Sequence, residues 1–454
     1  MKKLLPHQVY ALTCMDVEPR LGIFFHAGTG KTAIVLSWLI EAMRDGRVKK
    51  ALVAVPASLV PSWEQEVDGM AEFEGVTGED IKALKENVLI RSYQKLYKSD
   101  KKETSHRDGN ITARKVYRLR DDVDIPFDAV IYDESQAIAS HKSVNYRVSQ
   151  IFARVCKYAY ILTGTPISGS TKAGGEDLAK LFGQLKFIKP DIWRNWTDFC
   201  DRFVVSMNKY YQPTGYRVDE LHSLMANMSI MTRLEDCVDL PETVTVRVPC
   251  PLAEKKVYND FNRQDFGKYG IELRTSGVKF QKMLQLCSGN VKTDTDILSF
   301  KTSKDDVLAD ILDESDEPMV IFCQYSASVD RCKAICLKNG RNPVVFDGRS
   351  NGPTWKKFVS GEYDTLVVQY AAGGAGLNLQ TSHRMVLFEP CFSSLQWTQA
   401  LARIRRQGQK QSCVYKMLYT PGTVEERVLS CVMDGISVTE KTFEDWALNG
   451  IPEI

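Results

Sequence analysis

The chain has 454 residues, of which 44% are hydrophobic and 26% are charged, and its formal net charge is +2. This length exceeds what one hydrophobic core usually supports, so we expect two or three soluble globular domains. The near-neutral charge neither indicates nor excludes a nucleic-acid partner, because such binding needs a local basic track rather than a basic average.

The sequence argues against a membrane or secreted protein. No apolar run approaches the roughly 20 residues that cross a bilayer, and the segment from Met1 to Gln8 lacks the apolar core of a signal peptide. The 12 cysteines form no C-x-x-C pair and no metal-like cluster, which indicates reduced thiols. We therefore expect a cytoplasmic protein with no membrane partner.

Short apolar runs recur along the chain. Runs this short that are apolar on both faces are typical of buried parallel strands alternating with helices. They fall into two sets, which predict an α/β fold with two doubly wound domains. The first set is 51–55, 88–90, 129–132 and 158–162, and the second is 319–322, 344–346, 365–368 and 385–388. A further apolar run, 21–25, precedes the first set.

The region between the two sets, roughly Thr171 to Lys304, is mostly helical in pattern and rich in aromatic residues. We predict a domain boundary near Asp239-Leu240-Pro241, and four parts: 1–170, 171–240, 241–304 and 305–454. Both middle parts are expected to be helical. The charged stretch Lys98–Arg120 is expected to be an exposed β-ribbon or loop in the first domain, or a disordered linker loop.

A glycine-rich segment, Gly28-Thr-Gly30-Lys31-Thr32, follows the first apolar run and precedes a helical pattern. Backbone N–H groups of such a loop can cradle phosphates, Lys31 supplies a positive charge, and the Thr32 hydroxyl can bind Mg²⁺. The longer phosphate-loop pattern has a glycine where Phe25 stands, so only the shorter form matches. The alternative is an ordinary strand–helix turn.

Asp133 and Glu134 directly follow the apolar run 129–132. A carboxylate at the end of a parallel strand can hold Mg²⁺, and the next one can orient and deprotonate an attacking water. The alternative is a solvated acidic turn. Thr163-Gly-Thr-Pro166 follows the run 158–162, and its hydroxyls can hydrogen-bond the Asp-Glu loop.

The second domain carries two further motifs. The glycine-rich loop Gly373–Asn378 follows a predicted strand and allows close approach to a nucleic-acid phosphate or a nucleotide. Arg403 and Arg406 are three residues apart, which predicts that they share one helix face. They could bind the ATP phosphates, bind nucleic acid, or pair with acidic neighbours.

Taken in order, these motifs resemble those of the Swi/Snf-like ATPases of helicase superfamily 2, over nearly all of residues 4–430. Further segments that carry the resemblance are Leu5–Gln8, Leu52–Glu64, Ser92–Gln94, Met231–Pro241, Gln285–Gly289 and Val320–Tyr325. The chain departs from the family at Gln136, where a histidine is usual, at Phe25-His26, where acidic residues are common, at Ala371, where a basic residue is usual, and at Thr232, where an arginine is usual.

The resemblance implies two RecA-like domains and a DNA-dependent ATPase that translocates on double-stranded DNA, with ATP and Mg²⁺ as cofactors. It implies catalytic roles for Lys31, Glu134, Arg403 and Arg406. It implies that Gln8 reads adenine and that Thr32 and Asp133 hold Mg²⁺. The full set of residues it implies for ATP contact is Gln8, Ala27, Gly28, Thr29, Gly30, Lys31, Thr32, Asp133, Gln136 and Gly376. It implies nucleic-acid contacts for Ser58, Trp63, Ser92, Tyr93, Gln324, Gly373, Gly374 and Asn378.

Two other functions stay open at this point. A strand-separating helicase on forked or single-stranded DNA, or on RNA, would need a wedge, and Lys98–Arg120 is the only obvious candidate. A nucleotide-gated binding module would instead displace a protein partner and hydrolyse ATP slowly. The small size resembles that of bacterial or phage-encoded members of the family, so we expect the cytoplasm of a bacterial or phage-infected cell as the location. We also expect a monomer.

Overall fold

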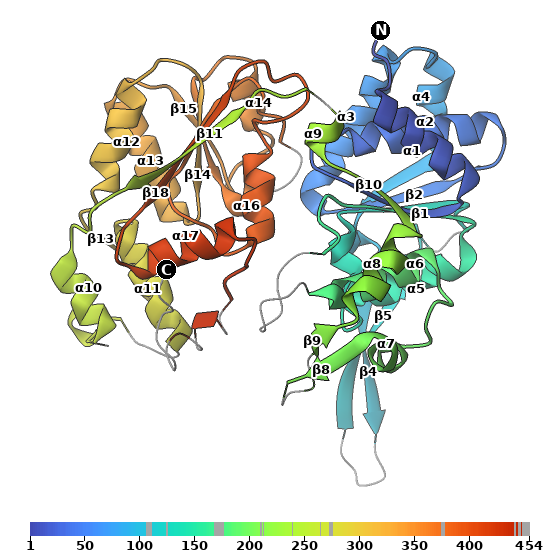
Figure 1. Ribbon diagram of the computed structural model, residues 1–454, viewed down its shortest axis with the longest axis horizontal. Coiled ribbons are helices and arrows are strands. Elements are labelled where there is room, and N and C mark those ends of the chain that lie inside the picture. Colours follow the sequence, from blue (N-terminus) through green and yellow to red (C-terminus); the bar gives the residue numbers. More distant parts are fainter. Residues whose placement is uncertain are drawn as a thin grey trace. The chain divides into compact units, whose positions relative to one another are not determined.

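The structure is a computed structural model that describes residues 1–105, 111–123, 126–167, 177–208, 211, 213–237, 239–263, 265–271, 276–373, 377–439, 442–443 and 446. The chain divides into two compact units, Met1–Asp239 (unit 1) and Leu240–Ile454 (unit 2), each built around its own sheet (Figure 1). In the described part of the chain, no helix is long and apolar enough to cross a membrane.

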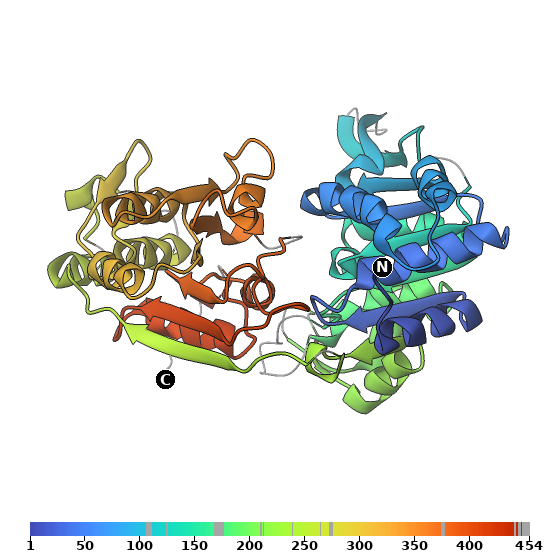
Figure 2. The same ribbon diagram turned by 90° about the horizontal axis from the view of Figure 1, so that it is seen from above.

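Unit 1 contains a sheet of six strands in the order β10-β1-β7-β6-β2-β3, and every neighbouring pair is parallel. The strands are β1 (Arg20–Phe25), β2 (Ala51–Val55), β3 (Val88–Ser92), β6 (Ala129–Asp133), β7 (Tyr158–Leu162) and β10 (Ser229–Thr232). The central strands are fully buried because helices lie on both faces of the sheet (Figure 2). All four predicted strands of the first set are confirmed, and the apolar run 21–25 also forms a strand.

The helices of unit 1 connect these strands and supply the remainder of its core. They are α1 (Pro6–Val17), α2 (Lys31–Arg44), α3 (Val60–Gly69), α4 (Gly78–Asn87), α5 (Val144–Val155), α6 (Leu181–Ile188), α7 (Trp196–Phe203), α8 (Val218–Ala226) and α9 (Leu234–Cys237). Helix α2 is buried along most of its length, and its Trp38 packs edge-on against Tyr158 and Tyr160 of β7, with ring centroids 5.1 and 4.8 Å apart.

Unit 2 contains a second sheet of six strands, in the order β11-β18-β17-β14-β16-β15, again with every neighbouring pair parallel. The strands are β11 (Thr243–Pro249), β14 (Met319–Cys323), β15 (Pro343–Phe346), β16 (Thr365–Gln369), β17 (Arg384–Leu387) and β18 (Cys413–Tyr419). All four predicted strands of the second set are confirmed. The expected fold class, two doubly wound parallel-sheet domains, is therefore correct.

The helices of unit 2 are α10 (Lys255–Asn262), α11 (Ser276–Cys287), α12 (Lys304–Asp313), α13 (Ser326–Lys338), α14 (Trp355–Val359), α15 (Tyr370–Gly373), α16 (Ser394–Leu401) and α17 (Val424–Met433). A buried ion pair joins two of them: the Lys304 ammonium at the start of α12 donates to the Glu425 carboxylate at the start of α17 over 2.6 Å. Both side chains are essentially inaccessible to solvent.

The prediction that residues 171–304 are mostly helical is incomplete. This region contains β10 and β11, each at the edge of a six-stranded sheet, and two hairpins, β8 (Val204–Met207) with β9 (Pro213–Tyr216) and β12 (Asn290–Lys292) with β13 (Ile297–Ser299). Strand β11 is largely exposed, so it lacks the continuous apolar run of a central strand. The finer division at residues 170 and 304 stays a prediction.

Strands β4 (Tyr97–Ser105) and β5 (Ile111–Leu119) pair in antiparallel register as a two-stranded ribbon. Of the alternatives for Lys98–Arg120, the β-ribbon is therefore confirmed for its described residues. Tyr97 packs edge-on against Tyr117, with ring centroids 5.6 Å apart, and contacts the core of unit 1 at the base of the ribbon. The ribbon extends away from the sheet of unit 1 (Figure 1).

Asp80 joins two helices of unit 1. Its carboxylate accepts hydrogen bonds from the Thr77 N–H and hydroxyl, both at 2.6 Å, and so caps α4. It also accepts two bonds from the Arg44 guanidinium at the end of α2, at 2.8 and 2.6 Å. The hydrogen-bonded Arg44 holds the pKa of Asp80 well below its usual range.

We expect Asp80→Asn to lower the free energy of unfolding by about 1–3 kcal/mol at pH 7, because a half-satisfied buried cluster remains. The folded pKa lies below the unfolded value of about 3.9, so this contribution is present above that value and is lost as pH falls through the acid range. Urea unfolding at several pH values checks both statements. The matched control is Asp68→Asn, since Asp68 makes an exposed pair with Lys85 that should contribute under about 1 kcal/mol. Equal effects of the two variants would contradict the prediction.

Candidate nucleotide site

Three predicted motifs of unit 1 follow neighbouring strands of the sheet. The phosphate loop follows β1, the Thr163 loop follows β7, and the Asp133-Glu134 motif ends β6. Because these strands are parallel and adjacent, their carboxyl ends lie side by side at one edge of the sheet. This edge is where an open α/β sheet binds its ligand.

The backbone of the phosphate loop requires its glycines. Gly28 and Gly30 have φ values of 88° and 80°, in the left-handed region that favours glycine. A Cβ atom on Gly30 would also lie 2.2 Å from the amide nitrogen of Gln8. Lys31 begins α2, and its ammonium donates to the carbonyl oxygens of Phe25 and His26 at 2.8 and 3.2 Å. The lysine therefore lies back over the loop it follows.

Gln8 on α1 fastens the loop to the N-terminal helix. Its amide nitrogen donates to the Thr29 carbonyl at 3.1 Å, and its amide oxygen accepts from the Leu5 N–H at 2.8 Å. The Nε2 atom of His7 also lies 2.9 Å from the Thr29 carbonyl oxygen, a contact that the sequence did not indicate. Gln8 is only 5% exposed, and its bond to Thr29 gives it a structural role in the loop in addition to the expected contact with adenine.

Asp133 is the last residue of β6, and its carboxylate is buried. One oxygen accepts the Glu134 N–H at 2.9 Å, and the other accepts the Trp63 indole N–H at 2.8 Å. Burial and, to a smaller extent, the neighbouring Glu134 raise the pKa of Asp133 to about 6, although Lys31 and the Trp63 hydrogen bond favour the charged form. Lys31 and Asp133 are thus close enough to interact electrostatically.

Glu134 has a left-handed backbone, with φ 50° and ψ 55°, which is uncommon for a residue with a side chain. The Gln136 amide donates to its carboxylate at 2.8 Å, and the Thr163 hydroxyl donates to the other end of the Gln136 amide at 2.8 Å. The predicted link between the Thr163 loop and the Asp-Glu loop is therefore present. It runs through Gln136, which bonds to both Thr163 and Glu134.

The residues at this edge suit a nucleotide with Mg²⁺. Thr32 lies in the first turn of α2, directly after the phosphate loop. Its hydroxyl and the Asp133 carboxylate are hard oxygen donors of the kind that Mg²⁺ prefers. The described residues contain no group of three or more His, Cys, Asp or Glu side chains that could hold a metal alone. The two oxygen donors of Thr32 and Asp133 suit an Mg²⁺ ion that is also bound by phosphate oxygens.

Arg403 and Arg406 of unit 2 do not lie on one helix face as predicted. Helix α16 ends at Leu401, before both arginines, and the Arg403 N–H donates to the Ala400 carbonyl three residues back in the turn that follows. The turn that follows nevertheless brings the two guanidinium groups to one acceptor. Both donate to the Leu377 carbonyl, at 3.4 and 3.0 Å.

Family models match the chain over most of its length. The model described as "SNF2-related domain" matches residues 10–310, and the model described as "Helicase conserved C-terminal domain" matches residues 303–408. The chain belongs to the SNF2-related family. The predicted resemblance to Swi/Snf-like ATPases of helicase superfamily 2 is confirmed, and with it the expected class of enzyme.

Similar SNF2-related proteins occur in bacteria and eukaryotes. The "Uncharacterized ATP-dependent helicase YqhH" of Bacillus subtilis is 24% identical over 96% of this chain and 79% of its own length. The "DNA repair protein rhp54" of Schizosaccharomyces pombe is 24% identical over 92% of this chain and 56% of its own length. The solved structure "Sulfolobus solfataricus SWI2/SNF2 ATPase core in complex with dsDNA" is 17% identical, covers 98% of this chain and 93% of its own, and has a TM-score of 0.42.

The residues expected to contact nucleic acid in this SNF2-related chain differ in exposure. Ser58 and Asn378 are exposed and Gln324 is half-buried, so their side chains are available to a ligand. Four other candidates lie in the interior: Ser92, Trp63, Tyr93 and Gly373. A direct contact by the three buried side chains is therefore wrong for this structure. Gly374 and Gly376 lie outside the described residues.

Gly373 has a packing role. A Cβ atom at this position would lie 2.7 Å from Val368 and 2.8 Å from Phe322, both in the core of unit 2. Glycine is therefore needed there so that α15 can pack against the sheet.

Glu389, which the sequence did not indicate, organises the loop that carries Gln324. One carboxylate oxygen accepts the N–H groups of Gln324 and Tyr325 at 2.8 and 3.0 Å, and the other accepts the Ser328 hydroxyl at 3.0 Å. Burial raises the pKa of Glu389. A single glutamate after an apolar strand has no spacing that could have revealed this role.

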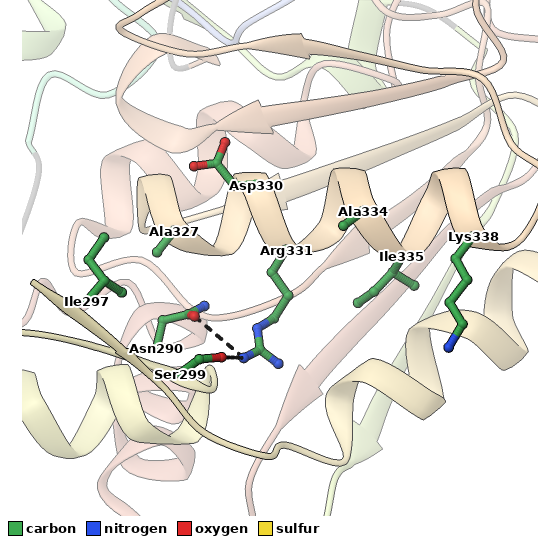
Figure 3. Close-up of a pocket in the computed structure, with 9 residues that line it drawn as sticks. All are labelled: Asn290, Ile297, Ser299, Ala327, Asp330, Arg331, Ala334, Ile335 and Lys338. Atoms are coloured by element: carbon green, nitrogen blue, oxygen red, sulfur yellow. Dashed lines mark hydrogen bonds between the residues drawn. The ribbon is translucent and has the colours of Figure 1, made fainter.

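A separate cavity of about 530 Å³ lies in unit 2 between α13 and the β12–β13 hairpin (Figure 3). Arg331 projects from α13 toward the hairpin and donates to the Ser299 hydroxyl at 3.1 Å and the Phe300 carbonyl at 3.0 Å. No predicted site residue lines this cavity, so it forms no part of the candidate nucleotide site.

Proposed function

We propose that this chain hydrolyses ATP with Mg²⁺ and uses the reaction to translocate along double-stranded DNA. The observation that carries the proposal is the joint placement of the phosphate loop, Asp133 and Glu134 at one sheet edge in a member of the SNF2-related family. The fission yeast relative is named a DNA repair protein, which supports DNA as the substrate.

Each residue has a defined part in this proposal. The loop N–H groups and Lys31 bind the phosphates, and Thr32 and Asp133 hold Mg²⁺, which neutralises phosphate charge during transfer. Glu134 orients the attacking water and takes its proton. Gln136 and Thr163 hold the Glu134 carboxylate in place.

Arg403 and Arg406 would stabilise the charge that develops on the γ-phosphate when unit 2 meets unit 1. Adenine recognition by Gln8 and a monomeric state are part of the same proposal. Bacterial relatives support a bacterial or phage-infected cell as the setting, with the cytoplasm as the proposed location.

Strand separation is the second candidate function, because the β4–β5 ribbon supplies a projection that could act as a wedge. A helicase with this mechanism would be activated by forked or single-stranded substrates more than by a blunt duplex. A nucleotide-gated module that displaces a protein partner would show slow hydrolysis that no nucleic acid accelerates.

We expect duplex DNA to stimulate ATP hydrolysis more strongly than single-stranded DNA or RNA. Because phosphate contacts dominate such binding, the logarithm of DNA affinity should fall linearly with the logarithm of salt concentration. Steady-state ATPase rates on the three nucleic acids, with DNA affinity measured across a salt series, check both statements. Strong stimulation by single-stranded RNA with none by duplex DNA would contradict the substrate assignment.

A further inference from the structure

Two aromatic residues of unit 1 lie in the interior and bond to the Asp133-Glu134 motif. Trp63 is 2% exposed and Tyr93 is 4% exposed. The Trp63 indole donates to the Asp133 carboxylate at 2.8 Å. The Tyr93 hydroxyl donates to the backbone carbonyl of Asp133, and it lies 3.3 Å from that of Glu134. Both buried side chains therefore contact the Asp133-Glu134 motif rather than a ligand at the surface.

Both residues lie next to exposed segments of the chain. Residues 57–58 are exposed just after β2, and α3 continues from them and places Trp63 in the interior within its first two turns. Residues 94–95 are exposed directly after Tyr93, at the end of β3. Strands β6, β2 and β3 are neighbours in the sheet, so these segments and the carboxylates share one edge.

The backbone at Glu134 depends on such support. A left-handed conformation is strained for a residue other than glycine and persists only where the surroundings hold it. Tyr93 bonds to the carbonyl groups on both sides of this strained position. Trp63 holds the preceding carboxylate, whose other oxygen accepts the Glu134 N–H. Trp63 therefore holds the Asp133 carboxylate, and Tyr93 holds the backbone that carries Glu134.

We propose that Trp63 and Tyr93 are positioning residues that link binding at the exposed segments 57–58 and 94–95 to the Asp133-Glu134 motif. A ligand that favours one arrangement of these segments favours the corresponding arrangement of the carboxylates, by its difference in affinity for the two. The Ser58 hydroxyl and the Lys95 ammonium suit a phosphate backbone. The inference rests on the proposed function only in taking duplex DNA as that ligand.

The first test is Trp63→Phe, which keeps an aromatic ring and removes the indole N–H. The readout is the affinity for a fluorescent ADP analogue with and without Mg²⁺, measured beside the affinity for duplex DNA. Loss of a group that orients a metal ligand typically costs about 10–100-fold in metal affinity. We expect the gain in nucleotide affinity on adding Mg²⁺ to fall about tenfold, while DNA affinity stays within about threefold.

Trp38→Phe is the matched control. Trp38 is equally buried in unit 1, and its indole nitrogen has no hydrogen-bond partner among the described residues. The substitution removes the same atoms from the core without touching Asp133. It should lower thermal stability and leave the Mg²⁺ dependence of nucleotide affinity unchanged.

Tyr93→Phe removes a single hydroxyl, and it decides the matter if Trp63→Phe does not fold. We expect the ratio of DNA-stimulated to basal ATPase rates to fall at least about tenfold, with little change in KM for ATP. A ratio equal to that of the unsubstituted protein would overturn the role of Tyr93.

Reduced DNA affinity of Trp63→Phe with an unchanged Mg²⁺ dependence would overturn the inference, because Trp63 would then act on the DNA side alone. Equal behaviour of the Trp63 and Trp38 variants would also overturn it. If duplex DNA fails to stimulate the unsubstituted protein, the proposed function fails. The comparison of the two tryptophan variants in Mg²⁺ still tests whether Trp63 positions Asp133.

Discussion

Replacing Glu134 with glutamine should lower ATP turnover by roughly 10² or more, while nucleotide still binds. The glutamine has the same shape but cannot take a proton from water. The structure explains why binding should survive. Gln136 donates to one oxygen of Glu134, and a glutamine side chain can still accept that bond through its amide oxygen. Turnover by steady-state assay and affinity for a fluorescent nucleotide measure the two effects separately.

The control for this variant is Glu64→Gln, the same chemical change on an exposed side chain of α3. It should leave turnover and nucleotide affinity unchanged. Near-normal turnover in Glu134→Gln would remove Glu134 from the catalytic role. A loss of nucleotide binding equal to the loss of turnover would instead show that Glu134 supports the shape of the site.

The sequence predicted the parts of the site that are local in the chain. Asp133 ends the buried strand β6, Glu134 directly follows it, and Lys31 follows β1 after a short loop, so the strand pattern fixes their place at the sheet edge. The strands themselves were predictable because an apolar run between polar segments has few alternatives to a central parallel strand. Strand β11 was missed because an exposed edge strand lacks this signal.

The direction in which a side chain points was less predictable. The family resemblance implied a nucleic-acid contact for Trp63, but its indole points inward to Asp133. Nothing in a linear motif distinguishes an aromatic ring that faces a ligand from one that holds a carboxylate. Similarly, the spacing of Arg403 and Arg406 suits a helix, but α16 ends at Leu401 and both side chains bond to Leu377 of a distant segment. Such contacts between distant segments leave no local pattern.

The largest effect should come from Arg406, which lies in unit 2 while Lys31 lies in unit 1. An arginine that reaches the γ-phosphate stabilises charge in the transition state, and such residues contribute about 10³–10⁵ in rate. Under the proposed function, Arg406 would make this contribution only in a state in which bound DNA brings the two units together. Arg406→Ala should therefore bind duplex DNA almost normally and lose most of the DNA-stimulated rate, while its basal rate changes much less.

Two further variants define what Arg406 contributes. Arg406→Lys keeps the charge but loses the planar fork that donates to Leu377 in the structure, so it should recover only part of the stimulated rate. Arg405→Ala removes a neighbouring arginine and should retain most of it. Stopped-flow phosphate release with and without duplex DNA gives both rates for each variant. Full DNA-stimulated turnover in Arg406→Ala would mean that this guanidinium serves only its contacts within unit 2, and closure of the units would then have to act through another group.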